Sequence, residues 1–298
     1  WQTAGRGQNT LLPHHTKLLI QANSSTTTSS TIVDQSAFGH TVTASGAVHS
    51  QGDPIFGNTA IWFDGTNDYL SVTNDGAGGD FDVSDGQDWS YECWFKRTDT
   101  SAGNHAHFWS VSSDSADGVY ITYRDGATDI QFGSWNGTDV MIYVELGAHP
   151  VGWHHLAAGK VAGMNCIWYD GQLHDAKAQV AGPEFNGTDE IFIGRGAGSG
   201  WNSQYFEGYM DGIRFCKGQS AYTPNFIPYG GQKNVAVSRG GAVTDARHPS
   251  ANTHAIRMGQ AAIGSTLATN ANTYCLDFDG TADYLYHNTP AWNSADSQ

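Results

Sequence analysis

The chain has 298 residues, of which 29 are acidic and 14 are basic, giving a net charge of −15 at pH 7. It has no basic stripe for binding nucleic acid or an anionic bilayer, and no apolar run reaches the ~18 residues that cross a membrane. Nucleic-acid binding, adhesion to an anionic bilayer by a basic patch and membrane spanning are therefore excluded. The 37 Gly, 10 Trp, 13 Tyr and 13 Phe predict short strands joined by tight turns, and so an all-β protein.

Residues 1–16 are interpreted as an arm or linker, and the first domain is expected over residues 17–229. It opens with an apolar strand (KLLIQ) and a polar stretch at 23–31 (NSSTTTSST), which is typical of an exposed loop. In SYECWFKR the side chains of Tyr91, Cys93 and Phe95 alternate with those of Glu92, Trp94 and Lys96. This period of two indicates a strand with one face in the core.

Further strands of four to eight residues follow, separated by Asp-Gly and Asn-Gly turns. The turn at Asp170-Gly171 is typical of a two-residue hairpin. The expected strands are HFWSVSS, GVYITYRD, DIQFGSW, VMIYVEL, HHLAAGKV, MNCIWYDGQL, EIFIGR and MDGIRFC. Regular short strands of this kind predict a sandwich of two antiparallel sheets. The four cysteines (Cys93, Cys166, Cys216 and Cys275) form no CxxC pair and are expected to be buried apolar residues.

A long repeat links the two ends of the chain. Residues 63–70 (FDGTNDYL) and 278–285 (FDGTADYL) agree at seven of eight positions. Residues 230–298 are therefore interpreted as a linker plus an incomplete second copy of the domain. Two or three strands without a covering sheet are marginal in water. We therefore expect either that the polypeptide continues past Gln298 or that this segment completes a sheet in a neighbouring subunit.

Six motifs carry a family resemblance in their order and spacing: FDGTNDYL, SYECWFKR, GWHHLA, NCIWYDGQL, IFIGR and FEGYMDGIRFCKG. Over residues 17–229 the chain resembles the concanavalin A-like, laminin-G-like jelly-roll domain. The tail of the unit, CKGQSAYTPNFIPY, also resembles laminin-G-like domains of bacteriophage structural and tail proteins. The resemblance implies two antiparallel sheets packed face to face. Because such a fold serves many functions, function has to be argued from sites.

Catalysis is not expected. Glucanases of the resembled family carry a strand motif of two Glu flanking an Asp, and no strand here has that motif. No GxSxG, HExxH or P-loop sequence is present. The protein is therefore interpreted as a non-enzyme.

A structural Ca²⁺ is one candidate ligand, because carboxylate and carbonyl oxygens in loops suit this ion. The resemblance implies a site near the first long loop and the last strand, and the matching residues are Asp34, Asp64 and Asp211. Asp34 and Asp64 recur in the second copy as Asp245 and Asp279. The alternative is that these Asp residues only build turns.

Sugars stack on exposed aromatic rings and bond to nearby polar groups. The Gly-rich loop 194–208 carries Trp201 and Tyr205, and Trp135 stands beside an Asn-Gly turn. These three are the predicted ligand-binding residues, although most aromatic residues of a sandwich fill its core.

Two functions remain. The first is a virion surface protein, such as a tail fibre, spike or decoration subunit. It would bind glycans or a host-surface receptor and would assemble as a homo-oligomer or with virion partners. The alternative is a secreted, cell-surface carbohydrate-binding or adhesion module of a bacterium.

Overall fold

The structure is a computed structural model that describes residues 13–51, 54–73, 78–83, 86–98, 105–111, 117–124, 126–136, 140–179, 191–198 and 203–220, with the pairs 257–258 and 285–286. The chain divides into two compact units, Trp1–Tyr229 and Gly230–Gln298. The described residues of the first unit form strands and one 3-10 turn, η1 (Pro13–His15), and they contain no α-helix. None of the described residues belongs to a helix that could span a bilayer.

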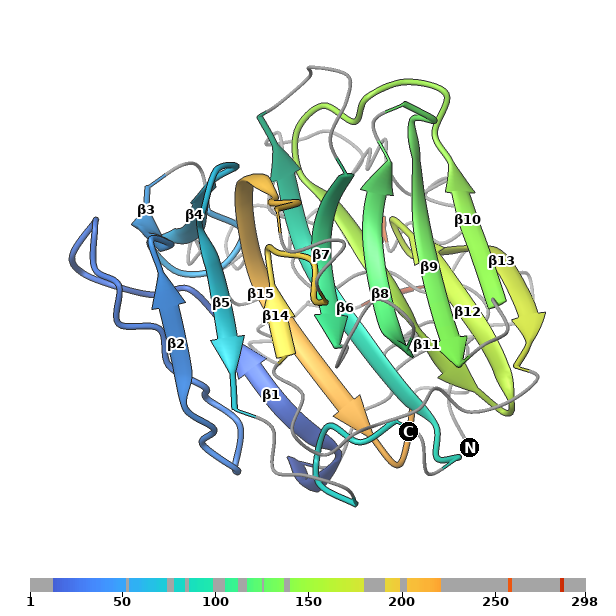
Figure 1. Ribbon diagram of the computed structural model, residues 1–298. Helices are drawn as coiled ribbons and strands as arrows, with labels where there is room; N and C mark the ends of the chain where they lie inside the picture. The colour runs from blue at the N-terminus through green and yellow to red at the C-terminus, as the bar shows by residue number, and fades with distance from the viewer. Residues whose placement is uncertain are drawn as a thin grey trace. The chain divides into compact units, whose positions relative to one another are not determined.

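The first unit contains two antiparallel sheets, and Figure 1 shows the seven-stranded sheet in front of the eight-stranded one. In spatial order, the seven-stranded sheet consists of β10 (Val140–Glu145), β9 (Asp129–Asn136), β8 (Asp117–Arg124), β7 (His105–Val111), β14 (Ile191–Ile193), β5 (Tyr69–Val72) and β2 (Val42–Ser45).

The eight-stranded sheet lies behind it. In spatial order it consists of β13 (Gln172–Ala178), β12 (Met164–Tyr169), β11 (His154–Val161), β6 (Trp89–Arg97), β15 (Glu207–Lys217), β4 (Ala60–Asp64) and β3 (Val48–Ser50), and β1 (Thr16–Ile20) also pairs with β15. The chain passes repeatedly between the sheets, as from β4 to β5 and from β6 to β7. Each crossing brings an apolar strand face onto the opposite sheet, which closes the sandwich core. The prediction of an all-β, two-sheet sandwich is confirmed.

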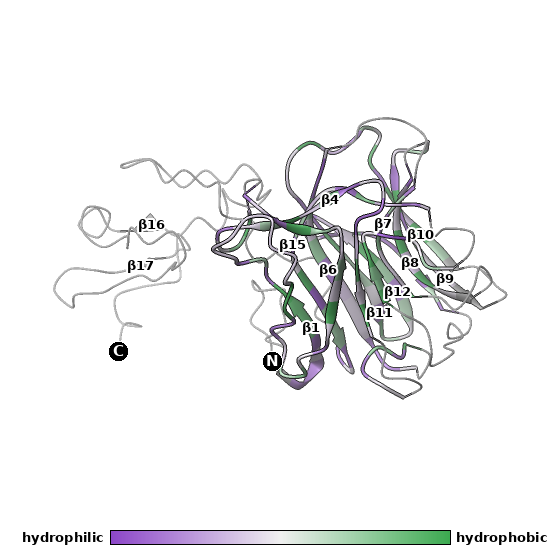
Figure 2. Cartoon of the chain, turned by 60° about the vertical axis from the view of Figure 1, so that its left-hand side comes forward, coloured by the Kyte–Doolittle hydropathy of each residue, from purple (hydrophilic) through white to green (hydrophobic). Residues whose placement is uncertain are grey.

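The core lies between the sheets and is rich in aromatic rings. Trp89, Trp109 and Phe215 pack with ring centroids 5.5–6.0 Å apart. The expected alternation on β6 is also observed, because Tyr91, Cys93 and Phe95 are all fully buried in this core. In Figure 2 the hydrophobic colour follows strands such as β1, β6 and β15. Cys93, Cys166 and Cys216 are buried free thiols, as expected for those three, and Cys275 lies outside the described residues.

The predicted hairpin between β12 and β13 is confirmed. Tyr169 pairs with Gln172, and the two residues between them, Asp170 and Gly171, have φ angles of 48° and 79°. Two consecutive left-handed residues define the turn that matches the twist of a two-stranded ribbon. The Asp170 side chain holds the turn against β11, because its Oδ1 accepts the His155 N–H at 2.8 Å.

In the second unit the structure describes a two-stranded antiparallel pair, β16 (Arg257–Met258) with β17 (Leu285–Tyr286). Apart from Leu285, the repeated FDGTADYL segment lies outside the described residues, as do Asp245 and Asp279. The second copy of the domain stays a prediction.

Candidate functional site

The outer face of the seven-stranded sheet is the candidate site. On each strand, alternate side chains enter the core, such as Ile121 on β8 and Phe132 on β9. The residues between them point to the other side of the sheet. This outer face mixes hydrogen-bonding groups with aromatic rings, and the central ones are Tyr69, His107, Ser110, Tyr120, Thr122, Gln131, Tyr143 and Phe192.

Gly133 leaves space for one of these rings, that of Tyr120. Tyr120 pairs with Gly133 on the neighbouring strand, and a Cβ added at Gly133 would lie 2.2 Å from Cζ of Tyr120. The phenol ring therefore lies flat over the space that any other residue would fill. The side-chain amide of Gln131 donates to the Tyr120 hydroxyl at 3.2 Å. The sheet thus presents Tyr120 in a fixed position.

The segment after β14 packs against this face. His107 Nε2 donates to Oε1 of Gln204 at 2.7 Å, and the Ser110 hydroxyl donates to the carbonyl of Arg195 at 2.8 Å. Two backbone bonds close the segment on itself, from Gly196 N to Gln204 O at 3.0 Å and from Phe206 N to Gly194 O at 2.9 Å. Arg195 and Gln204 are therefore both anchored to β7.

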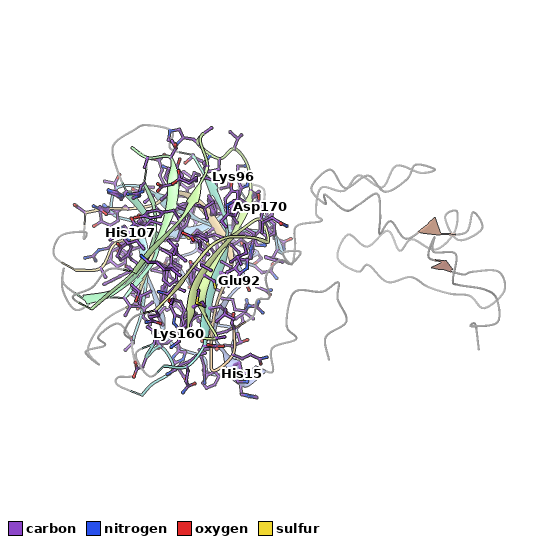
Figure 3. All side chains as sticks on the ribbon, turned by 90° about the vertical axis from the view of Figure 1, so that its right-hand side faces the viewer. His15, Glu92, Lys96, His107, Lys160 and Asp170 are labelled. Carbon is purple, nitrogen blue, oxygen red and sulfur yellow. The ribbon has the colours of Figure 1, made fainter. Side chains whose placement is uncertain are left out.

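Burial lowers the pKa of His107 to about 4, so its imidazole is neutral at pH 7. In Figure 3 it lies on the opposite side of the sandwich from Glu92 of the eight-stranded sheet.

The His107 pKa predicts a pH-dependent stability. In the unfolded chain the imidazole takes up its proton near pH 6.5, whereas in the folded chain it stays neutral down to about pH 4. Acid therefore favours unfolding, and between pH 7 and 5 this one group should remove about 2 kcal/mol of stability. The free energy of unfolding, measured in urea, should fall less between pH 7 and 5 for a His107→Gln variant than for the wild type. His14→Gln, at an exposed histidine, is the control, and equal falls in all three proteins would contradict the prediction.

Arg195 stands at the centre of an aromatic cluster on this face. Its guanidinium carbon lies 4.9 Å from the ring centroid of Tyr69 and 4.6 Å from that of Phe192, within the range of cation–π contacts. Tyr205 is paired with Arg195 through an isolated β-bridge and is partly exposed. The Nε of Arg195 is buried and has no hydrogen-bond partner among the residues that the structure describes. Such an orphaned donor is costly. The Arg195 residue as a whole is partly exposed, so a ligand oxygen could approach the accessible part of its guanidinium.

A second charged and aromatic group lies towards β10. Arg124 is held by two bonds to the Asp129 carboxylate, at 2.8 and 2.5 Å, and lies 4.8 Å from the ring centroid of Tyr143. The Tyr143 hydroxyl donates to the Met141 sulfur at 3.3 Å. Arg124, Met141 and Tyr143 are partly exposed, so this end of the face is accessible to a ligand.

Three residues, Trp201, Tyr205 and Trp135, were predicted to bind a ligand, and the structure describes them only in part. Tyr205 lies on it beside Arg195. Trp135 belongs to the same sheet, near the end of β9 opposite Gly118, although its side chain is outside the described residues. Trp201 is also outside them. The ligand-binding role of all three stays a prediction. The sequence analysis named neither Tyr120 nor Arg195 as a candidate, although a period-two pattern in GVYITYRD would have placed Tyr120 on the outer face of its strand.

The three Asp residues predicted to hold calcium each bind backbone groups. The carboxylate of Asp34 accepts the N–H groups of Leu19, Ser36 and His40 at 2.8–2.9 Å. Asp64 is exposed, and its Oδ1 accepts two N–H groups of the following turn.

Asp211 is fully buried, and its two oxygens accept four N–H groups, those of Ala22, Ile55, Phe56 and Gly212. In the parts of the chain that the structure describes, no three His, Cys, Asp or Glu side chains are grouped to hold a metal ion. These contacts give each Asp a structural role without a metal. Calcium binding stays a prediction.

Comparison with known proteins places this geometry in a family. Residues 64–221 match the family model described as the concanavalin A-like lectin/glucanases superfamily. No curated protein matches the sequence significantly. Among solved structures, the binding domain of Paraclostridial Mosquitocidal Protein 1 has a TM-score of 0.55 and 14% identity, covering 72% of this chain and 51% of that one.

Two other solved structures are similar. The receptor binding domain of botulinum neurotoxin D has a TM-score of 0.53 and 12% identity, covering 71% of this chain and 51% of that one. Domain 4 of an extracellular GH43 arabinanase from Geobacillus stearothermophilus, solved with arabinotriose, has a TM-score of 0.50 and 16% identity, covering 64% of this chain and 88% of that one. The chain therefore spans about half the length of the toxin domains. At these identities the likeness shows the fold alone.

Proposed function

Because the chain belongs to the concanavalin A-like lectin/glucanases superfamily, we propose that it is a non-enzymatic module that binds glycans on the outer face of its seven-stranded sheet. One observation carries the proposal. The partly exposed Arg195 places its guanidinium over the rings of Tyr69 and Phe192, beside the partly exposed Tyr205. A guanidinium that donates to a sugar hydroxyl next to rings that cover the sugar's apolar face is a typical arrangement for saccharide recognition.

The similar structures support the same class of ligand. The arabinanase domain was solved with arabinotriose, and the toxin domains are named as binding domains. The absence of the paired-Glu strand motif supports a binding role rather than hydrolysis.

The biological setting that we propose is the surface of a virion, with the module in a tail fibre, spike or decoration subunit that assembles as a homo-oligomer. The segment 216–229 (CKGQSAYTPNFIPY) supports this setting, because it resembles laminin-G-like domains of bacteriophage structural and tail proteins. So do three buried free thiols in the described part of the chain, because they suit assembly in a reducing cytosol. The alternative is a secreted bacterial carbohydrate-binding module, which the extracellular arabinanase domain favours.

A glycan array with matched tyrosine variants tests the binding site. The wild type should bind a defined set of oligosaccharides, and Tyr205→Ala should weaken that binding about tenfold, the loss expected for one well-placed contact. Tyr209→Ala is the control, because Tyr209 is also partly exposed but lies on β15 of the other sheet, where it packs on Trp62.

Both variants should melt within a few degrees of the wild type. A wild type that binds no glycan would overturn the proposed function. Binding that survives Tyr205→Ala but is lost in Tyr209→Ala would overturn the proposed location.

A further inference from the structure

A pocket of about 270 Å³ opens on the outer face of the eight-stranded sheet. It spans β1, β15 and β6, and its walls include Gln21, Phe56, Glu92, Trp94 and Arg214. Glu92 in its wall lies on the opposite side of the sandwich from His107 of the seven-stranded sheet (Figure 3). The volume is below the ~300–1,000 Å³ of most small-molecule sites, so it suits one small ring rather than a chain.

A backbone irregularity lies in the wall of the pocket. The register between β15 and β6 shifts between Asp211 and Arg214, and Gly212 at this point has a φ of 57°. A Cβ at Gly212 would lie 2.4 Å from Cε2 of Phe56, so the phenyl ring occupies the space that a side chain would take. The Phe56 N–H is bonded in turn to the buried Asp211 carboxylate at 2.8 Å. The aromatic rim is therefore fixed to the sheet.

The floor of the pocket is a fixed ionic group. Oε1 of Glu92 is paired with Nε of Arg214, and Oε2 accepts the Nε2–H of His155 at 2.8 Å. Glu92 is 6% exposed and Trp94, whose ring meets His155 edge-on, is 4% exposed. Burial alone would raise the pKa of Glu92, but Arg214 and His155 together outweigh burial and hold the pKa of that carboxyl below its usual range. The carboxylate is therefore ionised, and each oxygen keeps acceptor capacity.

Arg214 is only partly satisfied by this arrangement. Its Nη2 is buried and has no hydrogen-bond partner among the residues that the structure describes. The pocket thus offers a guanidinium donor and a carboxylate acceptor side by side, with the aromatic residues Trp94 and Phe56 in the same walls. Buried polar groups are almost always paired in folded proteins, so Nη2 is an unsatisfied donor behind the pocket wall. The Arg214 side chain as a whole is 17% exposed and lines the pocket, so a ligand oxygen can approach the accessible part of its guanidinium.

We propose that this pocket is a second binding site and that its ligand is a single neutral sugar ring. Of two neighbouring hydroxyls, one would donate to Glu92 while the other accepts from the accessible part of the Arg214 guanidinium. The partly exposed Phe56 ring would cover the apolar face of the sugar ring. The Glu92 carboxylate would repel an anionic ligand, and the Arg214 guanidinium would repel a cationic one. An uncharged polyol is the class of ligand that can bond to both groups.

The test uses the full chain and follows the Trp94 indole N–H by NMR, with Trp94→Phe to assign its signal. Methyl glycosides of glucose, galactose, mannose and N-acetylglucosamine are titrated to about 50 mM, well above a millimolar Kd. At least one should shift the Trp94 signal in a saturable manner. Arg214→Lys keeps a charge beside Glu92 but removes the guanidinium fork, and it should weaken binding about tenfold or more.

Two further variants make the test decisive. Gln21→Trp fills the pocket from its rim without touching the ionic floor, and it should abolish the shift even if Arg214→Lys folds poorly. Arg195→Lys alters only the site on the other sheet and should leave the shift unchanged. The proposal is overturned if no glycoside shifts the Trp94 signal, or if the shift survives both pocket variants. The glycan array reports separately on the other face, so either site can fail alone.

Discussion

Replacing Asp211 with Asn is expected to lower the melting temperature of the first unit by about 10 °C, although the change replaces one oxygen by an NH₂ group. Oδ1 of Asp211 accepts two backbone N–H groups, and Oδ2 accepts two more. The amide nitrogen of Asn would face two of these donors and leave them unsatisfied in a fully buried site. Two buried donors without acceptors cost about 3–5 kcal/mol, which corresponds to this shift for a domain of the size.

The matched control is Asp64→Asn. Asp64 is exposed, and only its Oδ1 accepts N–H groups, so an Asn side-chain oxygen can replace it. Its melting temperature should change by less than about 2 °C, as is usual at the surface. The measurement is thermal unfolding at about pH 8.5, because burial raises the pKa of Asp211 to about 7 and the carboxylate must be ionised. Equal melting temperatures for both variants would contradict the role assigned to Asp211.

Gly159→Ala is expected to destabilise the domain by about 3 kcal/mol or more, a large effect for one methyl group. Gly159 lies in β11 between Ser90 of β6 and Cys166 of β12. A Cβ there would come within 2.1 Å of the Trp89 carbonyl oxygen and 2.7 Å of the Ser90 Cα. These are backbone atoms, so no side-chain rotation relieves the contact. The strands must separate beside the buried Trp89 ring, which makes the cost of overpacking high.

Gly126→Ala serves as its control. Gly126 lies in the turn between β8 and β9, and an added Cβ would meet no atom within 4 Å. It should change stability by less than about 1 kcal/mol in either direction. Chemical denaturation of both variants separates close strand packing from a general effect of replacing glycine. A Gly159→Ala protein as stable as Gly126→Ala would show that β11 and β6 can move apart at little cost.

The site on the seven-stranded sheet could be predicted only in part. The alternation in GVYITYRD and DIQFGSW places Tyr120, Gln131 and Gly133 on one face, because a strand has a fixed period of two. The contact of Arg195 with the rings of Tyr69 and Phe192 has no such local signal. It depends on β14 lying between β5 and β7, and strand order is set by the fold as a whole.

The sequence by itself determined the all-β class, the inward faces of the strands and the hairpin at Asp170-Gly171, because these follow from local periodicity and turn preference. Only the tertiary structure decided that Glu92, Arg214 and His155 meet, since they come from three strands far apart in the chain. It also decided that Asp211 accepts four buried backbone N–H groups. The family resemblance implied that Asp211 binds calcium, and that role stays a prediction. Local sequence does not show these contacts, because the packing of strands far apart in the chain determines which backbone N–H groups come within reach of a carboxylate.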